Sequence, residues 1–207
     1  MLKKEEELSA LAGYIPEGSF EDVLGFIKTY QVHLTITRQR HSVLGDYRHA
    51  HLNKNHRISI NGNLNKYAFL ITLLHEIAHL LNFEKYGNRV PSHGREWKNE
   101  FSKLLAGFLL KKLFPADIEK ALMKTLQNPA ASSCGDDHLL RVLHIYDENT
   151  HGLVLVEKIR EGKLFRINGG RVFKKGEKLR KRYKCEELST GKIYLFSPVF
   201  EVKEITD

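Results

Sequence analysis

The feature that most constrains this chain is the run ITLLHEIAHLLNFEKYGNRVPSHGREW at residues 71–97. It contains an HExxH motif, with His75, Glu76 and His79 inside an apolar, helix-forming segment. Four residues advance an α-helix by about 400°, so the two histidines lie about 40° apart on one face. Two such imidazoles can bind one Zn²⁺, and Glu76 can reach a water on the metal as a general base. The motif therefore predicts a buried helix that carries a metal site.

A catalytic zinc needs a third protein ligand and one open position for water. The spacing HExxHxxGxxH would place glycine at 82 and histidine at 85, but the chain has Asn82 and Lys85, which excludes that version. Two glutamates on the next predicted helix, Glu96 and Glu100, would suit a site that a carboxylate completes. His93 competes with them, because it opens that helix and the chain can turn back toward the motif there.

HEIAH, the Tyr86-Gly87-Asn88 loop and HGREW together resemble the SprT-like family of zinc-dependent proteases, the relatives of Spartan. Leu44-Gly45 on a predicted strand and Arg57–Ile60 just before the helix are also similar. The resemblance covers about residues 19–127. It implies a zincin-like fold and one catalytic zinc, with Glu76 as the base. It also implies that the substrates could be DNA-bound or DNA-crosslinked proteins. The ligands that it implies are His75, His79 and His93.

The chain departs from the family pattern in its C-terminal part. Members often carry a zinc ribbon built from two CxxC pairs, whereas this chain has only Cys134 and Cys185 and no CxxC. A four-cysteine zinc site cannot be built from one such chain. The C-terminal part is therefore a module without that metal site.

The pattern of apolar residues predicts an α+β protein in two parts. A zincin-like domain at residues 15–127 holds a small sheet and the HExxH helix. A linker at 128–137 leads to a β-rich module at 138–207, a small barrel or a curled sheet. The predicted helices are 20–30, 65–86, 93–112 and 115–127. The predicted strands are 32–36, 43–47 and 57–60 in the first part, then 139–146, 153–159, 164–167, 171–173, 182–187 and 193–196.

Positive charge is concentrated in two segments. The formal net charge is +8, and residues 166–184 alone hold nine Lys and Arg against one acid, Glu177. A second basic stretch runs from Arg38 to Arg57 and contains several histidines. Such segments suit a polyanion, and nucleic acid first. The residues that we expect to contact it are Arg171, Lys174, Lys175, Lys178, Arg180, Lys181 and Arg182.

Other roles follow from position along the chain. Tyr86, Arg89 and Arg95 lie near the motif and are candidates for stabilising a tetrahedral oxyanion. The strand at 57–60 could hold an extended peptide substrate by strand addition. Trp97 is expected to anchor its helix in the core.

Taken as a whole, the sequence predicts a zinc metallopeptidase that hydrolyses peptide bonds of protein or peptide substrates. The alternative is a nucleic-acid-binding adaptor whose zinc site is structural or weakly active. The start of the chain is too polar for a signal peptide and no apolar run reaches the length of a membrane span, so we expect a cytoplasmic protein that does not enter membranes.

Overall fold

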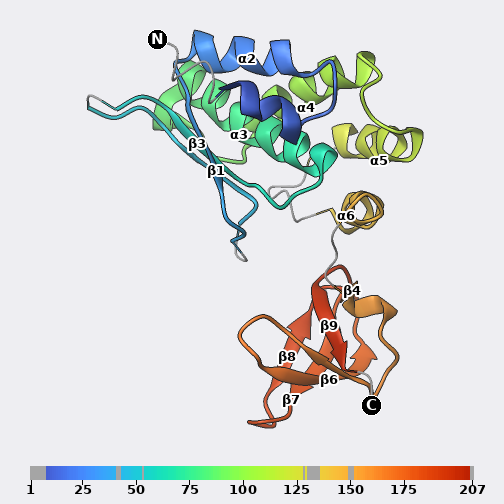
Figure 1. The fold of residues 1–207 in the computed structure, drawn as a ribbon. Helices are drawn as coiled ribbons and strands as arrows, with labels where there is room; N and C mark the ends of the chain where they lie inside the picture. The colour runs from blue at the N-terminus through green and yellow to red at the C-terminus, as the bar shows by residue number, and fades with distance from the viewer. Residues whose placement is uncertain are drawn as a thin grey trace. The chain divides into compact units, whose positions relative to one another are not determined.

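The computed structural model describes residues 8–40, 43–52, 54–127, 129, 136–148 and 152–205. These residues form a mixed α+β structure with five α-helices and two β-sheets (Figure 1). The predicted α+β class is therefore confirmed. Within these ranges, no helix combines the length and the apolar character that crossing a membrane requires.

The first sheet has three strands in the order β1-β3-β2. Its members are β1 (His33–Thr37), β2 (Gly45–Arg48) and β3 (Arg57–Asn61). The central strand β3 pairs in parallel with β1 and antiparallel with β2. Side chains alternate between the two faces of a strand, so Ile58 and Ile60 enter the core while Arg57 and Ser59 point away from it. All three predicted strands of this part are present.

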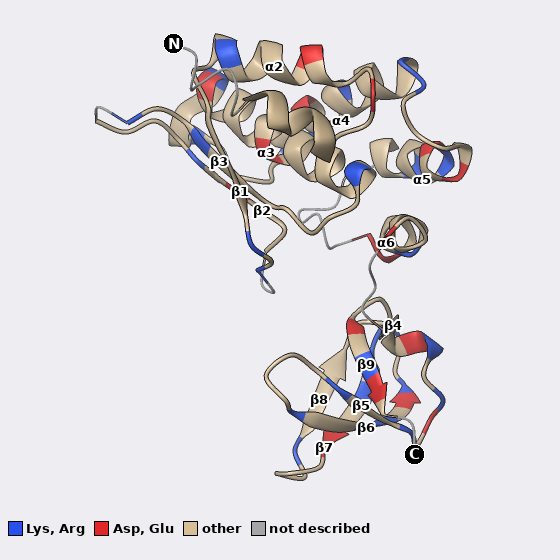
Figure 2. Ribbon diagram, viewed as in Figure 1, with Lys and Arg blue, Asp and Glu red and all other residues tan. Residues whose placement is uncertain are grey.

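The HExxH motif lies on α3 (Lys66–Tyr86), the longest helix of the described chain. Asn65 caps its start, because the side-chain oxygen accepts hydrogen bonds from two backbone N–H groups of the first turn. Most residues from Phe69 to Leu80 are buried, since the sheet packs on one side of α3 and α4 on another. The helix ends at Gly87, whose φ of 59° favours glycine. Its few charged residues (Figure 2) are Lys66, Glu76, Glu84 and Lys85.

The remaining helical segments of the N-terminal part surround this core. They are η1 (Ala10–Tyr14), α2 (Phe20–Thr29), η2 (Gly87–Arg89), α4 (Arg95–Leu110), α5 (Ala116–Gln127) and α6 (Asp137–His144). The apolar stripe of α4 includes Trp97, Phe101 and Leu105, and it packs against α3. This contact sets the start of α4 beside the HExxH motif.

The prediction of a strand at residues 139–146 is wrong, because residues 137–144 form the helix α6. Asp136 caps this helix by accepting hydrogen bonds from the first-turn N–H groups. Leu139 and Leu143 lie four residues apart on one face and are both buried. The spacing of the apolar residues in this segment is compatible with a helix and with a short strand. The capping hydrogen bonds of Asp136 favour the helix. The helix packs against α5.

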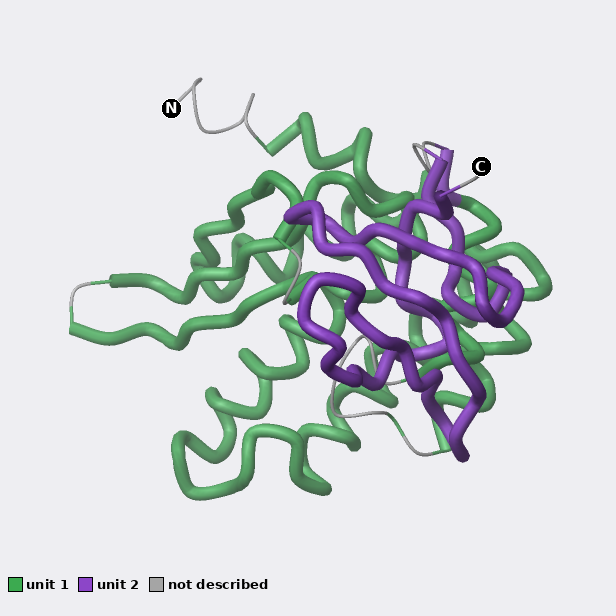
Figure 3. The backbone as a smooth tube through the Cα atoms, turned by 90° about the horizontal axis from the view of Figure 1, so that it is seen from below, with its two compact units in different colours: residues 1–146 green, residues 147–207 purple. Residues whose placement is uncertain are grey.

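The chain separates into two compact units, residues 1–146 (unit 1) and residues 147–207 (unit 2), coloured separately in Figure 3. Each has its own core of buried apolar side chains. The division falls later than the predicted linker at 128–137, of which the structure describes residues 129, 136 and 137. The described part of that linker ends in the cap and first residue of α6, which belongs to unit 1.

Unit 2 is a six-stranded sheet in the order β4-β9-β5-β6-β7-β8, with every neighbouring pair antiparallel. Among the described residues, the edge strands β4 and β8 do not pair with each other, so the sheet is open. Of the two predicted forms, a barrel or a curled sheet, the barrel is therefore excluded. The chain passes from the short β4 directly into a 3-10 helix, which leaves little strand for closure. The elements are β4 (Leu153–Leu155), η3 (Val156–Lys158), β5 (Leu164–Arg166), β6 (Val172–Lys178), β7 (Tyr183–Glu187), β8 (Ile193–Phe196) and β9 (Glu201–Ile205).

The core of unit 2 is aromatic. Phe165, Phe173 and Phe196 pack against one another, with ring centroids 4.9–5.6 Å apart. Cys185 is a buried free thiol in the same core. The strand β9 was not predicted, whereas the other five strands correspond to predicted ones. Cys134 lies outside the described residues.

Candidate metal centre

Three histidines meet where α3 packs against the start of α4. His75 and His79 come from successive turns of α3, and His93 lies just before Gly94, the N-cap of α4. One ring nitrogen from each of the three lies within 4.8 Å of the other two. Nε2 of His93 is 3.4 Å from Nε2 of His75. Zn–N bonds of about 2.0–2.1 Å at tetrahedral angles place two ligand nitrogens about 3.3 Å apart, so this donor set fits zinc.

The indole of Trp97 lies against all three imidazoles. Its ring centroid is 4.6 Å from that of His75, 5.2 Å from that of His79 and 4.7 Å from that of His93. Trp97 is fully buried, so the prediction that it anchors α4 in the core is confirmed. Because α4 begins at Arg95, the first turn of this helix brings Trp97 under the histidines and fixes their spacing.

Burial makes the three imidazoles poor bases. Desolvation, followed by the nearby His79 and His93, lowers the pKa of His75 to about 3. Desolvation and then His93 lower the pKa of His79 to about 4. The pKa of His93 is also lowered by burial. All three rings are therefore neutral at pH 7, which is the form that binds a metal ion.

The carboxyl group of Glu76 is buried beside this cluster, under β2. Burial raises the pKa of Glu76 to about 8; the charge of Asp46 adds to the rise and that of Arg40 opposes it. Gly45 of β2 approaches the side chain so closely that a Cβ there would lie 2.7 Å from Oε1 of Glu76. The close approach of a bare backbone thus defines the position of the carboxylate.

A cavity of about 560 Å³ opens onto His75, Glu76, His79 and His93. Its wall comes from the β2 segment, from the end of α3 and from the loop that leads to His93. The other lining residues are Val43, Leu44, Gly45, Asp46, Tyr47, His49, Asn82, Phe83, Gly87, Asn88, Val90 and Ser92. The cavity is large enough for a short stretch of polypeptide.

Tyr47 was not identified from the sequence, although it shares a strand face with Gly45. Its ring stacks parallel to that of His79, with centroids 6.3 Å apart. Its hydroxyl donates to Nδ1 of the buried His56, 2.9 Å away, and the backbone N–H of Ala50 donates to the same nitrogen. The ring proton of His56 is therefore on Nε2, which lies 3.2 Å from Oε1 of Glu84. The chain of contacts ties β2 to α3.

The glutamates that competed with His93 have other surroundings. Glu100 is buried, and its carboxylate accepts a hydrogen bond from Nζ of Lys85 at 2.7 Å. A side-chain oxygen of Glu96 lies 3.9 Å from the guanidinium of Arg95. Neither glutamate belongs to the cluster of possible metal ligands found among the described residues, and His93 does.

Two of the other predicted roles do not fit the structure. β3 is the central strand and pairs on both sides, so residues 57–60 have no edge for a substrate strand. The edge that borders the cavity belongs to β2. Of the described residues, those that line the cavity include none of the three oxyanion candidates, Tyr86, Arg89 and Arg95.

The predicted nucleic-acid contacts lie on unit 2 (Figure 2) and differ in their exposure. Six of them are exposed: Arg171, Lys174, Lys178, Arg180, Lys181 and Arg182. Lys175 differs from the prediction, because it is buried and its ammonium donates to the carbonyls of Glu157 and Ile159. Arg171 is held by Glu187, whose Oε1 lies 2.5 Å from its Nε. The exposed cations are therefore a smaller set than predicted.

Comparison with known proteins gives one match. Residues 19–111 match the model of the SprT-like family. The resemblance drawn from the sequence is thus confirmed over a segment that contains all three histidines and Glu76. No curated protein and no solved structure matches the chain. Unit 2 lies outside the matched segment.

Proposed function

We propose that this chain, whose residues 19–111 belong to the SprT-like family, is a zinc-dependent metallopeptidase of zincin-like fold. The observation that carries the proposal is the set of three neutral imidazoles within 4.8 Å of one another, with a buried carboxyl group beside them and a cavity in front. A structural zinc site would be closed by a fourth ligand, whereas this one opens onto the cavity.

When bound, Zn²⁺ supplies a Lewis acid that polarises the scissile carbonyl and makes water more acidic. His75, His79 and His93 would hold it, and Trp97 keeps their rings in place. A cation held by the histidines would favour the ionised form of Glu76, and this carboxylate takes a proton from the attacking water and returns it to the leaving amine. Its burial keeps competing solvent away from the carboxylate while the transfer takes place.

The substrate would lie along β2 in an extended conformation. Residues 43–47 line the cavity, and β2 is an edge strand of the described sheet, so its backbone groups can pair with a peptide. Gly45 keeps this wall thin over Glu76. Strand addition at β2 takes the role that the sequence analysis assigned to residues 57–60.

The exposed cations of unit 2 support the second part of the proposal, which concerns DNA. Lys174, Lys178, Arg180, Lys181 and Arg182 suit the phosphate backbone of DNA, so DNA-bound or DNA-crosslinked proteins are the substrates that we favour. If the zinc site were structural, the same cations would support the alternative, a nucleic-acid-binding adaptor. A cytoplasmic location stays a prediction.

The decisive experiment measures cleavage of an unstructured protein, casein, by the zinc-loaded chain with and without single-stranded DNA. We expect Glu76→Gln to lower the rate by about 10²–10⁴-fold while the bound zinc is retained. Glu96→Gln, the same change at a nearby glutamate outside the cluster, should leave the rate within about twofold, a shift of less than 0.5 kcal/mol. Zinc binding and DNA binding without any cleavage would establish the adaptor instead.

A further inference from the structure

The unit 1 sheet has an outer face that the metal centre does not use. On β2, Gly45 and Tyr47 share the strand face toward the cavity, and Asp46 and Arg48 alternate with them, although Asp46 also lines the cavity. On β3, Arg57 and Ser59 share the side of Arg48. Every side chain that these strands direct outward is polar or charged, whereas the core of a protein–protein interface is mainly apolar.

Three basic side chains form a row across this face. His33, Arg57 and Arg48 are register partners on β1, β3 and β2. Neighbouring strands are about 4.8 Å apart, so these side chains leave the sheet at about that spacing. Like charges directly opposite on paired strands destabilise a sheet. The row therefore does not contribute to the stability of the sheet, which suggests that it has a functional role.

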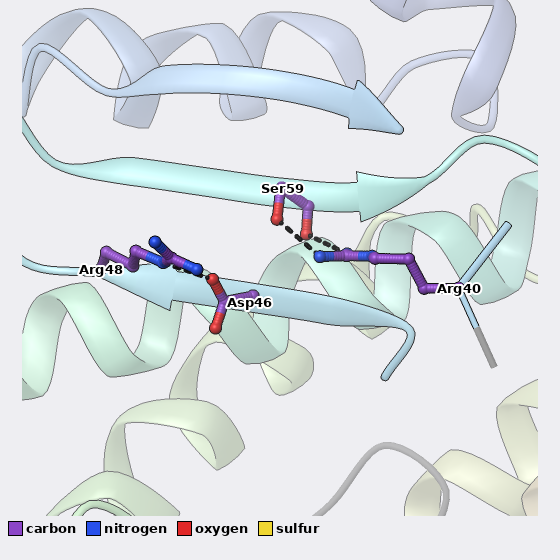
Figure 4. Close-up of polar contacts among 4 residues, drawn as sticks. All are labelled: Arg40, Asp46, Arg48 and Ser59. Carbon is purple, nitrogen blue, oxygen red and sulfur yellow. Dashed lines mark hydrogen bonds and ion pairs between the residues drawn. The ribbon is translucent and has the colours of Figure 1, made fainter. Parts of the chain in front are cut away.

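The two arginines of the row are open to solvent. Arg48 Nε lies 2.9 Å from Asp46 Oδ2 (Figure 4). The Arg48 side chain is nevertheless 66% exposed. Arg57 is exposed and makes no side-chain hydrogen bond or ion pair with any residue that the structure describes. Asp46 is the single acid among the outward residues of the three strands.

A further arginine is fixed at the end of the same face. Nε of Arg40 donates to Oδ1 of Asn61 at 2.8 Å. Its Nη1 donates to Oγ of Ser59 at 3.0 Å and its Nη2 to the Ser59 carbonyl at 3.1 Å (Figure 4). A guanidinium has five N–H donors, so two remain for a ligand. Holding the group in place beforehand lowers the entropy that an anion must overcome on binding.

We propose that Arg40, Arg48, Arg57 and His33 form a binding surface for the phosphate backbone of a nucleic acid. Several arginines on a polar face suit a partner that carries one phosphate charge at every nucleotide. The inference rests on the nucleic-acid part of the proposed function and does not depend on peptide hydrolysis.

The surface has a direct relationship to the cavity. Both are built on β2: residues 45 and 47 line the cavity, Arg48 lies on the outer face, and Asp46, which pairs with Arg48, also lines the cavity. A bound nucleic acid would be separated from the cavity by one layer of sheet. A protein attached to that nucleic acid would be held at high local concentration next to Glu76.

The test uses the full chain carrying Glu76→Gln and a fluorescein-labelled single-stranded DNA, with fluorescence anisotropy followed as a function of salt. We expect the pair Arg48→Glu and Arg57→Glu to weaken binding about tenfold or more. The slope of log K against log salt should fall by about 1.4, or 0.7 for each lost phosphate contact on a single strand. A labelled duplex, where the expected loss is about 1.8, shows which form the surface prefers.

The matched control reverses the same number of charges at Lys120 and Lys124, two exposed residues on α5 of the same unit. If the control pair weakens DNA binding as much as the arginine pair, the change in net charge accounts for the effect and the proposed binding surface is wrong. Zinc content and thermal unfolding show whether the variants fold. The double variant Arg48→Gln and Arg57→Gln should also weaken DNA binding, but by less than the charge reversal. Because the assay needs no turnover, a chain without peptidase activity would leave this result intact.

Discussion

Gly45 and Glu76 are in contact across the interface between β2 and α3, and that contact leaves no room for a side chain at position 45. A Cβ there would lie 2.7 Å from Oε1 and 2.9 Å from Cγ of Glu76, and 2.8 Å from Cγ2 of Thr72. These distances are shorter than van der Waals contact. The strand and the general base are therefore positioned by each other.

Gly45→Ala should reduce kcat by about 10²-fold, because displacing a catalytic group by about 1 Å can have an effect of that size. Zinc content should stay at the wild-type level, since the atoms nearest to the new methyl group belong to Glu76 and Thr72 and not to a histidine. Gly25→Ala is the matched control: Gly25 lies within α2 and has nothing within 4 Å of its Cβ position. That control should be neutral or slightly stabilising. Wild-type kcat in Gly45→Ala would contradict the conclusion that Gly45 sets the position of Glu76.

His93→Ala should remove most of the bound zinc, measured as metal per chain by elemental analysis. Two ligands on α3 would remain, which is one fewer than a catalytic zinc site needs. His138→Ala removes an exposed histidine from α6 and should leave the metal content unchanged. Glu100→Gln should also retain zinc, because Glu100 is bound to Lys85. Zinc lost from Glu100→Gln but kept in His93→Ala would reverse the assignment of the third ligand.

The zinc-free protein should be most stable near pH 6.5. Glu76 has a pKa of about 8 when folded against an ordinary 4.5, so the folded state binds an extra proton and gains stability as the pH falls from 8. His75 and His79 have folded pKa values of about 3 and 4 against an ordinary 6.5. Below 6.5 the unfolded state therefore takes up two protons that the folded state does not, and stability falls.

Urea unfolding at a series of pH values measures this dependence. The double variant His75→Leu and His79→Leu removes the loss on the acid side, while Glu76→Gln removes the gain between pH 8 and 6.5. A zinc-free protein whose stability rises steadily from pH 5 to pH 8 would show that Glu76 is ionised in the folded state.

Lys175→Met should destabilise unit 2 by about 1–3 kcal/mol, because the carbonyls of Glu157 and Ile159 lose a buried donor. The salt dependence of DNA binding should not change, since the ammonium is not exposed. Lys174→Met gives the opposite pair of outcomes: little change in stability, and a salt slope lower by about 0.7–0.9. Thermal unfolding and anisotropy titrations measure the two effects. Equal DNA-binding losses in both variants would contradict this division.

The site residues that lie on a single helix were predictable from the sequence. The residues that reach the site through packing between elements were not. The spacing of His75 and His79 places them on one face of any helix, and the break at Pro91 allowed His93 to return to them. Gly45 and Tyr47 became visible only when β2 was laid over α3, because nothing in their local sequence indicates what they contact. Arg40 reaches Asn61 and Ser59 from across the sheet, which is equally nonlocal.

In the fold, too, features that depend on the local sequence were predictable, whereas features that depend on packing were not. The helix α3 was predicted almost to the residue, because its cap and apolar run lie in the sequence. At 137–144 the apolar pattern suits both a strand and a helix, and the capping side chain of Asp136 together with packing on α5 decides for the helix. Lys175 was assigned to the surface because it stands in a basic run, but the alternation of β6 directs it inward.

The position of His93 also bears on how the protein folds and is degraded. Its partners lie on α3, and the chain leaves that helix at Gly87 before it reaches His93. A metal ion shared by them is a reversible cross-link that closes a loop on the order of 15 residues, for which a covalent bridge would contribute about 3 kcal/mol. Metal supply would then set the lifetime of this segment: chelation should expose residues 87–94 to hydrogen exchange and proteolytic nicking before the rest of unit 1 opens.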